Sequence, residues 1–375
     1  MKRFNLTTPI NTLSYGLVGL NILKQLCNLN YKVALWPLGG IEADPDDHEL
    51  IKDCLKNAQL YDRNAPSLRI WHQFDLAQYV GRESVAFPIF ELNKFTNNEH
   101  CHLTQLDKLI VCSDWAKNVC LANAITRFEP EVNHKSETEK LIKKGPEIFI
   151  VPLGVDRSIF HENYAKIWDS TKTIFMNVGK WELRKGHDVL IECFNEAFSE
   201  SDNVELHMHC YNPFIGEKGN QEWTDLYMNS NMGQAGKIKI SPQRFENQRD
   251  LARIMSKVDC GVFPARAEGW NLDALEMLSM GKQLIITNYS GHTQFCNSKN
   301  SHLIEHEEKM EDAIDGVFFN GQGEWLEFTD DMKASLVEKM QKVHKNKKEL
   351  NIEGIGTAKQ FSWQHSVQEL LKVYE

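Results

Sequence analysis

The chain has 375 residues, 42% hydrophobic and 25% charged, which is typical of a globular protein of about two domains. The net charge of −10 argues against a uniformly basic nucleic-acid binder and against membrane attachment through a basic amphipathic helix. Polar residues interrupt the N-terminal segment, no run of about 18 apolar residues follows, and the nine cysteines form no framework. We therefore expect a cytoplasmic protein with reduced thiols.

Strands and helices alternate along the chain. In the first half we predict strands near 4–6, 32–36, 68–71, 85–90, 109–112 and 147–151, with helices over 14–28 and 47–57 and from residue 113. The polar run at 129–144 predicts a surface excursion. In the second half we predict strands near 173–178, 204–210, 236–240, 259–263 and 283–287, with helices between them and a final helix at 363–374. Such alternation predicts an α/β protein with parallel, doubly wound sheets.

The first half offers candidate ligand contacts where its predicted strands end, because ligands of open α/β sheets lie beyond the carboxyl ends of the strands. Tyr15 and Gly16 follow the first strand, His72 follows LRIW, and Glu91 follows FPIF. Structural roles are the alternative. Gly16 can be a glycine tolerated in a helix, His72 a packed histidine and Glu91 a cap.

Two short acidic or histidine-rich segments resemble metal motifs, but neither predicts a metal site. Residues 99–102 (EHCH) lack a second ligand pair at the spacing that zinc needs. Asp44 and Asp46 flank a proline, where turn and capping chemistry is the better interpretation.

In the second half, the predicted strand 173–178 runs into the segment GKWELRKG and then into an amphipathic helix. Lys180 and Lys185 lie in this turn, with Arg184 beside them. Lysine is a compact charge suited to phosphate, and arginine adds planar, bidentate recognition.

A second turn of this type lies within VFPARAEGWNLDALEMLSM, residues 262–280, where a strand leads into a helix that starts near Asn271. The N–H groups and the dipole of a helix N-terminus favour an anion, most often phosphate. The backbone groups that we expect to face it belong to Gly269, Trp270, Asn271 and Leu272. Glu268 and Glu276 frame the turn. If Asn271 only caps the helix, both glutamates are solvated instead. Two such turns in one domain favour a diphosphate.

These segments together resemble a known family. Glu268 and Glu276 enclose seven residues, as in the E-x7-E signature of retaining family-4 glycosyltransferases. GKWELRKG is similar to the basic turn of that family, and VPLGVDRSIF (151–160) is similar to its interdomain segment. This sequence departs from the usual motifs at Asn271, Trp270 and Lys180, where the family more often has Gly, Phe and Arg.

The resemblance implies the GT-B fold, two doubly wound Rossmann-like domains that face one another across a cleft. We expect an N-terminal acceptor domain at 1–152, joined by a C-terminal helix at 361–375, and a donor domain at 153–360. The segments PINTLSYG, WHQFD and FPIFELNKF also loosely resemble glycosyltransferases of large tailed phages and some bacteria. The expected location is therefore the cytoplasm of a bacterium or of an infected host cell.

The resemblance further implies retaining, metal-independent transfer of a hexose or pentose from a nucleoside-diphosphate sugar, with UDP or GDP as the nucleotide and no other cofactor. Lys180, Lys185 and the amides of the 269–272 turn would stabilise the leaving diphosphate. Glu276 would accept the ribose hydroxyls, Glu268 would contact the sugar, and residues 241–245 would contact the base. The N-terminal contacts would be His72 at the sugar, Gly16 at the donor, and Tyr15 and Glu91 at the acceptor.

The sequence does not identify the acceptor of the sugar. A glycan or other glycoconjugate is one class of acceptor, and hydroxymethylated pyrimidines in DNA are another, for which Lys140, Lys143 and Lys144 form a local basic cluster. A non-catalytic sugar-nucleotide-binding protein is the alternative of another class. A glycoside hydrolase has no diphosphate leaving group and therefore does not need a cationic turn. An epimerase of the same fold would change the configuration of the sugar without transferring it.

Overall fold

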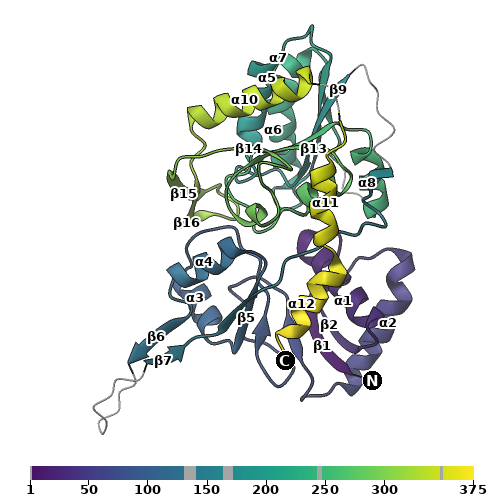
Figure 1. Cartoon of the computed structure of the whole chain (residues 1–375), viewed down its shortest axis with the longest axis vertical. Coiled ribbons are helices and arrows are strands. Elements are labelled where there is room, and N and C mark those ends of the chain that lie inside the picture. The colour runs from purple at the N-terminus through teal and green to yellow at the C-terminus, as the bar shows by residue number, and fades with distance from the viewer. Residues whose placement is uncertain (1, 131–140, 164–171, 243–246, 347–348) are drawn as a thin grey trace. The chain divides into compact units, whose positions relative to one another are not determined.

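The computed structural model describes residues 2–130, 141–163, 172–242, 247–346 and 349–375 (Figure 1). The chain forms two compact units, one of Met1–Leu153 with Trp363–Glu375 and the other of Gly154–Ser362. Each unit contains a six-stranded sheet in which all neighbouring strands are parallel, in the orders β2-β1-β3-β4-β5-β8 and β11-β10-β9-β12-β13-β14. The predicted class, α/β with two doubly wound Rossmann-like domains, is confirmed.

The N-terminal unit carries its helices between the strands of the first sheet. The strands are β1 (Arg3–Ile10), β2 (Lys32–Ile41), β3 (Ser67–Arg69), β4 (Val85–Ala86), β5 (Lys108–Val111) and β8 (Glu147–Ile150). The helices are α1 (Ser14–Asn28), η1 (Pro45–Asp47), α2 (His48–Asn57), η2 (Ala58–Leu60), α3 (Asn97–Thr104), α4 (Asp114–Ala122) and α12 (Trp363–Lys372). In the predicted surface excursion, β6 (Arg127–Pro130) and β7 (Leu141–Lys144) pair antiparallel.

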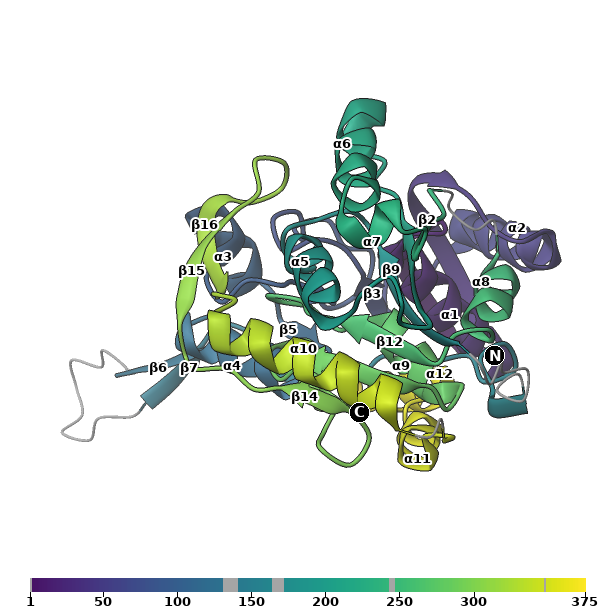
Figure 2. The same cartoon turned by 90° about the horizontal axis from the view of Figure 1, so that it is seen from above.

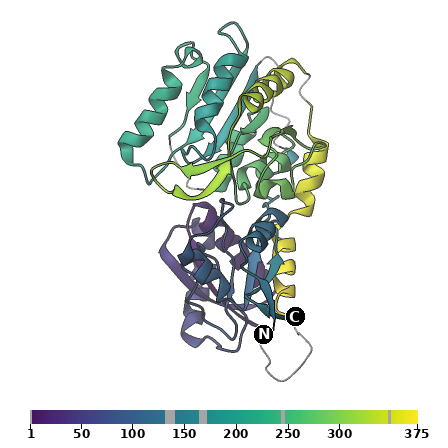
Figure 3. The same ribbon diagram turned by 90° about the vertical axis from the view of Figure 1, so that its left-hand side faces the viewer.

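The end of the chain packs into the N-terminal unit, where it forms the yellow helix beside the label C in Figure 3. This helix, α12, lies against α1. The Tyr374 hydroxyl donates to the Ser67 carbonyl at 2.8 Å, and Lys108 Nζ donates to the Val373 carbonyl at 2.9 Å. These bonds tie the chain end to β3 and β5, so α12 completes the cover of this sheet.

The C-terminal unit repeats the pattern and adds an antiparallel hairpin that we did not predict. The strands are β9 (Thr173–Gly179), β10 (Val204–Cys210), β11 (Ile238–Ile240), β12 (Cys260–Phe263), β13 (Gln283–Thr287), β14 (His302–Ile304), and the hairpin β15 (Met310–Ile314) with β16 (Asn320–Leu326). The helices are α5 (His187–Ala197), α6 (Gly216–Met228), α7 (Asn231–Gln234), α8 (Gln248–Met255), α9 (Leu272–Ser279), η4 (Gly291–Gln294), α10 (Asp330–Lys345) and α11 (Ile352–Gln360).

The core of this unit explains why its inner strands β12 and β13 are nearly continuous apolar runs. Phe175, Leu206, Val262 and Ile285, from four neighbouring strands, are fully buried. Helix α10 packs against α5, and α11 packs against α9 (Figure 2). Helices on both faces bury both sides of a parallel sheet, which accounts for the loss of apolar-polar alternation. Because β12 pairs directly with β9, the turns that follow these two strands lie side by side. Within the described part of the chain, every helix is too short or too polar to cross a membrane.

Candidate active site

Hydrogen bonds to backbone carbonyls hold the β9–α5 turn against the β12–α9 turn. The Arg266 N–H donates to the Arg184 carbonyl at 2.7 Å, and Arg184 Nη1 donates to the Ala267 carbonyl at 2.8 Å. Arg266 Nη1 also donates to the Leu183 carbonyl at 2.6 Å. Each turn therefore satisfies polar groups of the other, which holds their side chains in fixed relative positions.

Glycines allow this close approach. Gly186 has a φ of 71°, and a Cβ added there would collide with the Pro264 carbonyl of the other turn. A Cβ on Gly291 would collide with the Gly269 carbonyl. Both positions therefore need glycine for backbone contact between loops, and Gly186 also needs it for its left-handed conformation.

A chain of alternating charges runs through the paired turns. Lys180 Nζ lies 2.6 Å from one oxygen of Glu182, and Arg184 lies 2.6 Å from the other. Arg184 also lies 3.0 Å from Glu268 Oε2, while Lys185 Nζ lies 2.6 Å from Glu268 Oε1. Three cations thus surround two carboxylates, and the cluster keeps one excess positive charge.

The ionisation of Glu268 follows from these neighbours. Burial raises the pKa of the carboxyl, but the Lys185 and Arg184 cations outweigh burial and hold the pKa at about 2. Burial lowers the pKa of Lys185, and the Glu268 carboxylate reverses this, so that the pKa of Lys185 is raised. At neutral pH Glu268 is therefore an anion and Lys185 a cation.

His187, a buried histidine that the sequence analysis did not single out, supports the basic turn at residues 179–186. Its Nδ1 accepts from the Glu182 N–H at 3.1 Å, and its Nε2 lies 3.0 Å from Asn177 Oδ1. Asn177 in turn donates to the Val262 carbonyl on β12 at 2.7 Å. Burial lowers the pKa of His187 to about 3, so it acts as a neutral hydrogen-bonding link between the turn and Asn177 on β9.

Glu276 lies one turn into α9 and is 5% exposed, and its Oε2 has no hydrogen-bond partner among the described residues. Burial, Asp273 and Asp156 raise the pKa of Glu276 well above its usual range. Burial also raises the pKa of Asp273, in the first turn of the same helix, to about 6. A buried carboxyl oxygen without a partner is a costly feature of a folded protein and is suited to a ligand hydroxyl.

The 269–272 turn presents backbone rather than side chains. Asn271 has a φ of 75° and caps α9, because its side chain accepts from the Ala274 N–H at 3.1 Å. The helix starts where we predicted, and the cap of the alternative interpretation is present. Glu268 and Glu276 are buried, however, and not solvated as that alternative requires. Trp270 is buried, with its ring 5.0 Å from that of Phe295, so its side chain belongs to the core. Leu272 is the first residue of α9.

Ser290 is a further residue of this site that sequence reasoning missed. It has φ 72° and ψ −156°, a region that is otherwise almost restricted to glycine. Its hydroxyl accepts from the Glu268 N–H at 2.8 Å, and the Glu268 carbonyl accepts from the Gly291 N–H at 2.8 Å. The loop after β13 therefore fixes both backbone groups of Glu268. No short sequence motif predicts that Ser290 holds the Glu268 backbone, because the two residues meet only in the tertiary structure.

In the N-terminal unit the structure brings Tyr15 and His72 together, with ring centroids 4.6 Å apart. The Tyr15 hydroxyl donates to the Ile89 carbonyl and accepts from the Ile89 N–H, each at 2.8 Å. Because β4 ends at Ala86 and not near residue 90 as predicted, Tyr15 holds the segment that follows this strand and leads to Glu91. A Cβ on Gly16 would collide with Asn11, which gives this glycine a packing reason. The predicted contacts Tyr15, His72 and Glu91 therefore share one region of this unit.

Other predicted features lie outside the described residues or have local roles. Of the predicted base-contacting loop 241–245, residues 243–245 are not described, and Lys140 of the basic cluster is not described either. The Asp44 side chain accepts from the Asp46 N–H at 3.1 Å, which confirms its turn chemistry. Glu99 forms a capping box with Thr96 at the start of α3.

Comparison with known proteins adds to this geometry. Residues 172–318 match the family model described as "Glycosyl transferases group 1". The sequence comparison with curated proteins finds no match.

Among solved structures, sucrose-phosphate synthase from Thermosynechococcus elongatus aligns over 100% of this chain and 98% of its own, with TM-score 0.69 and 12% identity. A glycosyltransferase from Rickettsia africae ESF-5 aligns over 100% and 97%, with TM-score 0.63 and 13% identity. Anabaena HepE in complex with UDP and glucose aligns over 100% and 99%, with TM-score 0.62 and 11% identity. Likeness at these identities shows the fold.

The predicted GT-B architecture is thus confirmed. Residues 172–318, which match that family model, include both paired turns.

Proposed function

We propose that the protein is a retaining glycosyltransferase that moves a hexose or pentose from a nucleoside-diphosphate sugar to a hydroxyl acceptor. The observation that carries this proposal is the pairing of Glu268 with Lys185 and Arg184, at 2.6 and 3.0 Å, where two strand-to-helix turns meet. Fixed cations beside a helix N-terminus suit a diphosphate leaving group, whose developing charge is the main barrier to its departure.

In this proposal each charged residue has a distinct task. Lys185 and Lys180 neutralise the diphosphate together with the backbone amides of residues 269–272. Glu268 accepts hydrogen bonds from the sugar hydroxyls, for which its ionised state makes it suited. Glu276 accepts the ribose hydroxyls, and its buried oxygen, which has no partner within the described ranges, supports this role.

The two lysines of the basic turn differ in their surroundings. Lys185 contacts Glu268 directly, whereas Lys180 contacts Glu182 and lies over the Phe318 ring, 4.5 Å from its centroid. We therefore assign Lys185 to the reacting centre and Lys180 to the outer part of the diphosphate. Because cationic side chains supply the positive charge, we propose that transfer needs no metal ion.

We propose UDP or GDP as the nucleotide. HepE, which shares the fold, is described in complex with UDP and glucose. The N-terminal unit would hold the acceptor through Tyr15 and Glu91, with His72 at the transferred sugar and Gly16 near the donor. The net charge of −10 favours a glycan or another weakly charged acceptor over DNA.

A calorimetric titration with a panel of UDP-, GDP- and ADP-sugars tests donor binding. Donor hydrolysis and transfer are then measured with and without a chelator. NMR of the product reports whether the anomeric configuration is retained. Lys172→Met is a matched control for Lys185→Met, because Lys172 also forms a 2.6 Å ion pair, with Glu205, but at the opposite end of β9.

The outcomes separate the alternatives. Binding of one donor that is weakened in Lys185→Met but unchanged in Lys172→Met supports the site. Binding without hydrolysis or transfer to any acceptor would point to a non-catalytic binding protein, and an epimerised donor would point to an epimerase. Salt-dependent transfer to hydroxymethylated DNA would select the DNA acceptor, and failure of every donor to bind would refute the proposal.

A further inference from the structure

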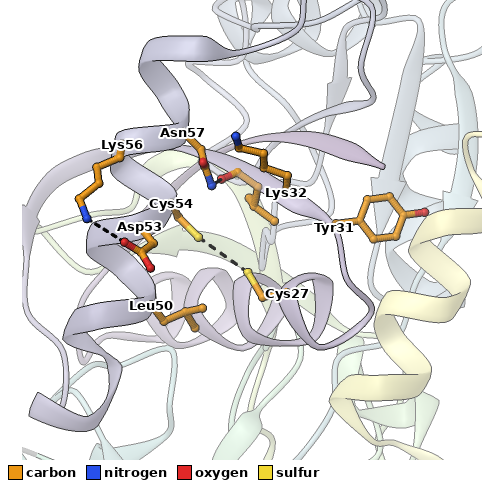
Figure 4. A pocket seen from close by; sticks show the side chains of 9 residues that line it. Cys27, Tyr31, Lys32, Leu50, Asp53, Cys54, Lys56 and Asn57 are labelled. Carbon is orange, nitrogen blue, oxygen red and sulfur yellow. Dashed lines mark hydrogen bonds and ion pairs between the residues drawn. The ribbon is translucent and has the colours of Figure 1, made fainter. Parts of the chain in front are cut away.

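A surface pocket of about 400 Å³ lies in the N-terminal unit, away from the predicted ligand contacts of that unit (Figure 4). The end of α1, the start of β2 and the second half of α2 line it. Because β2 starts here, the pocket lies at the amino end of the parallel sheet. Tyr15 and His72, by contrast, follow the carboxyl ends of their strands.

Two cysteines face one another in this pocket. Cys27 Sγ on α1 and Cys54 Sγ on α2 are 3.7 Å apart, and one thiol donates to the other. A disulfide needs about 2.05 Å between the sulfur atoms, so the two thiols must move closer than their present 3.7 Å to be joined. Among the described cysteines this is the pair seen in thiol–thiol contact.

The two thiols differ in access and in acidity. Cys27 is partly exposed, whereas Cys54 is 2% exposed. The hydrogen bond from Cys54 lowers the pKa of Cys27, and the same bond raises the pKa of Cys54. An accessible thiol with a lowered pKa beside a shielded second thiol is the arrangement of a nucleophilic and a resolving cysteine.

The charges of the pocket indicate the class of reagent. Lys32 and Lys56 contribute two cations and Asp53 one anion, with Lys56 Nζ 2.9 Å from Asp53 Oδ1. The lining thus carries an excess positive charge, which favours a small molecule with carboxylates. The size of the pocket suits a peptide-sized thiol rather than a folded protein.

We propose that Cys27 and Cys54 form a thiol–disulfide exchange site that takes small anionic disulfides, such as oxidised glutathione, through this pocket. The Cys27 thiolate attacks one sulfur of the disulfide, forms a mixed disulfide and releases the first glutathione thiolate. Cys54, after losing its proton, attacks Cys27 Sγ, forms the Cys27–Cys54 bond and releases the second glutathione. Two electrons pass from the protein to the reagent, and the two released thiolates take up the two protons.

The test uses the full chain in a Cys101→Ser background, since Cys101 is the exposed cysteine on α3 and would react on its own. After incubation with oxidised glutathione, intact mass and peptide mapping should show a loss of two hydrogens and a link between the peptides of Cys27 and Cys54. Cys54→Ser should stop at one glutathione on Cys27, and Cys27→Ser should stay unmodified at Cys54. Closing the loop should raise Tm by about 5 °C, reversed by dithiothreitol.

The parent chain with Cys101 intact shows that the reagent is active, because Cys101 should take one glutathione. If Cys101 is modified while Cys27 and Cys54 stay reduced, the proposal is wrong. It is also wrong if Cys27 keeps its glutathione although Cys54 is present. Both results come from chains with the native thiol pair, so they do not depend on the folding of a variant.

Discussion

Replacing Glu268 by glutamine is expected to destabilise the protein by an amount that depends on pH. Glutamine keeps the size of the side chain but removes the charge that faces Lys185 and Arg184. The pKa of Glu268 is about 2, against an ordinary value of 4.5. At 1.36 kcal/mol per pKa unit, this difference corresponds to about 3 kcal/mol of stability at neutral pH. Removing one partner of a buried ion pair typically costs about 3 to 5 kcal/mol, which agrees.

The sign of the pH dependence follows from the lowered pKa. The folded state holds Glu268 ionised more strongly than the unfolded state does, so its contribution is fully present well above pH 4.5. It is lost as the pH falls through about 2, and at pH 3 roughly half of it should remain. The gap between wild type and Glu268→Gln should therefore shrink from about 3 kcal/mol at pH 7 to about half that at pH 3.

Urea unfolding followed by circular dichroism at pH 7, 4.5 and 3 measures this gap. Glu49→Gln is the matched control, because Glu49 forms an ion pair with Lys52 at 3.2 Å on the exposed face of α2. Exposed pairs contribute little, so this change should leave stability nearly unaltered at each pH. A loss below about 1 kcal/mol for Glu268→Gln at pH 7, or a loss of the same size at all three pH values, would refute the assigned ionisation.

Three further predictions concern the same turns. Lys185→Met should lower the rate of sugar transfer by about 100- to 1,000-fold, measured as kcat at saturating donor. Donor affinity should increase as the pH rises through the raised pKa of Glu276, because ribose hydroxyls donate more strongly to the ionised carboxylate. The affinity of a 2′,3′-dideoxy nucleotide, which has no ribose hydroxyls to donate, should not depend on pH in this way. Gly291→Ala should lower both Tm and donor affinity, because the added Cβ would collide with the Gly269 carbonyl. The control Gly356→Ala lies in α11, where the Cβ would meet open space, and should leave donor affinity unchanged and Tm unchanged or raised.

Local sequence patterns predicted most elements of both sheets. Buried strands such as β12 are short continuous apolar runs, and the helix that follows is marked by Asn271 as its cap. The hairpin β15–β16 was missed, because its strands mix acidic residues, glycine and apolar residues, and so give no period of two. The 129–144 segment was predicted as an excursion, and its described ends pair as β6 and β7.

The sequence by itself determined that two strand-to-helix turns carry cations, glutamates and glycines, because residue type and order along the chain are enough to specify such turns. Only the tertiary structure decided which groups meet. Lys185 rather than Lys180 contacts Glu268, Ser290 holds the Glu268 backbone, and Cys27 lies against Cys54. These contacts join segments that are tens of residues apart in the sequence. Parallel strand pairing and helix packing bring them together in space. A local sequence pattern does not predict which distant segments meet, since strand register and side-chain packing are set by the whole core.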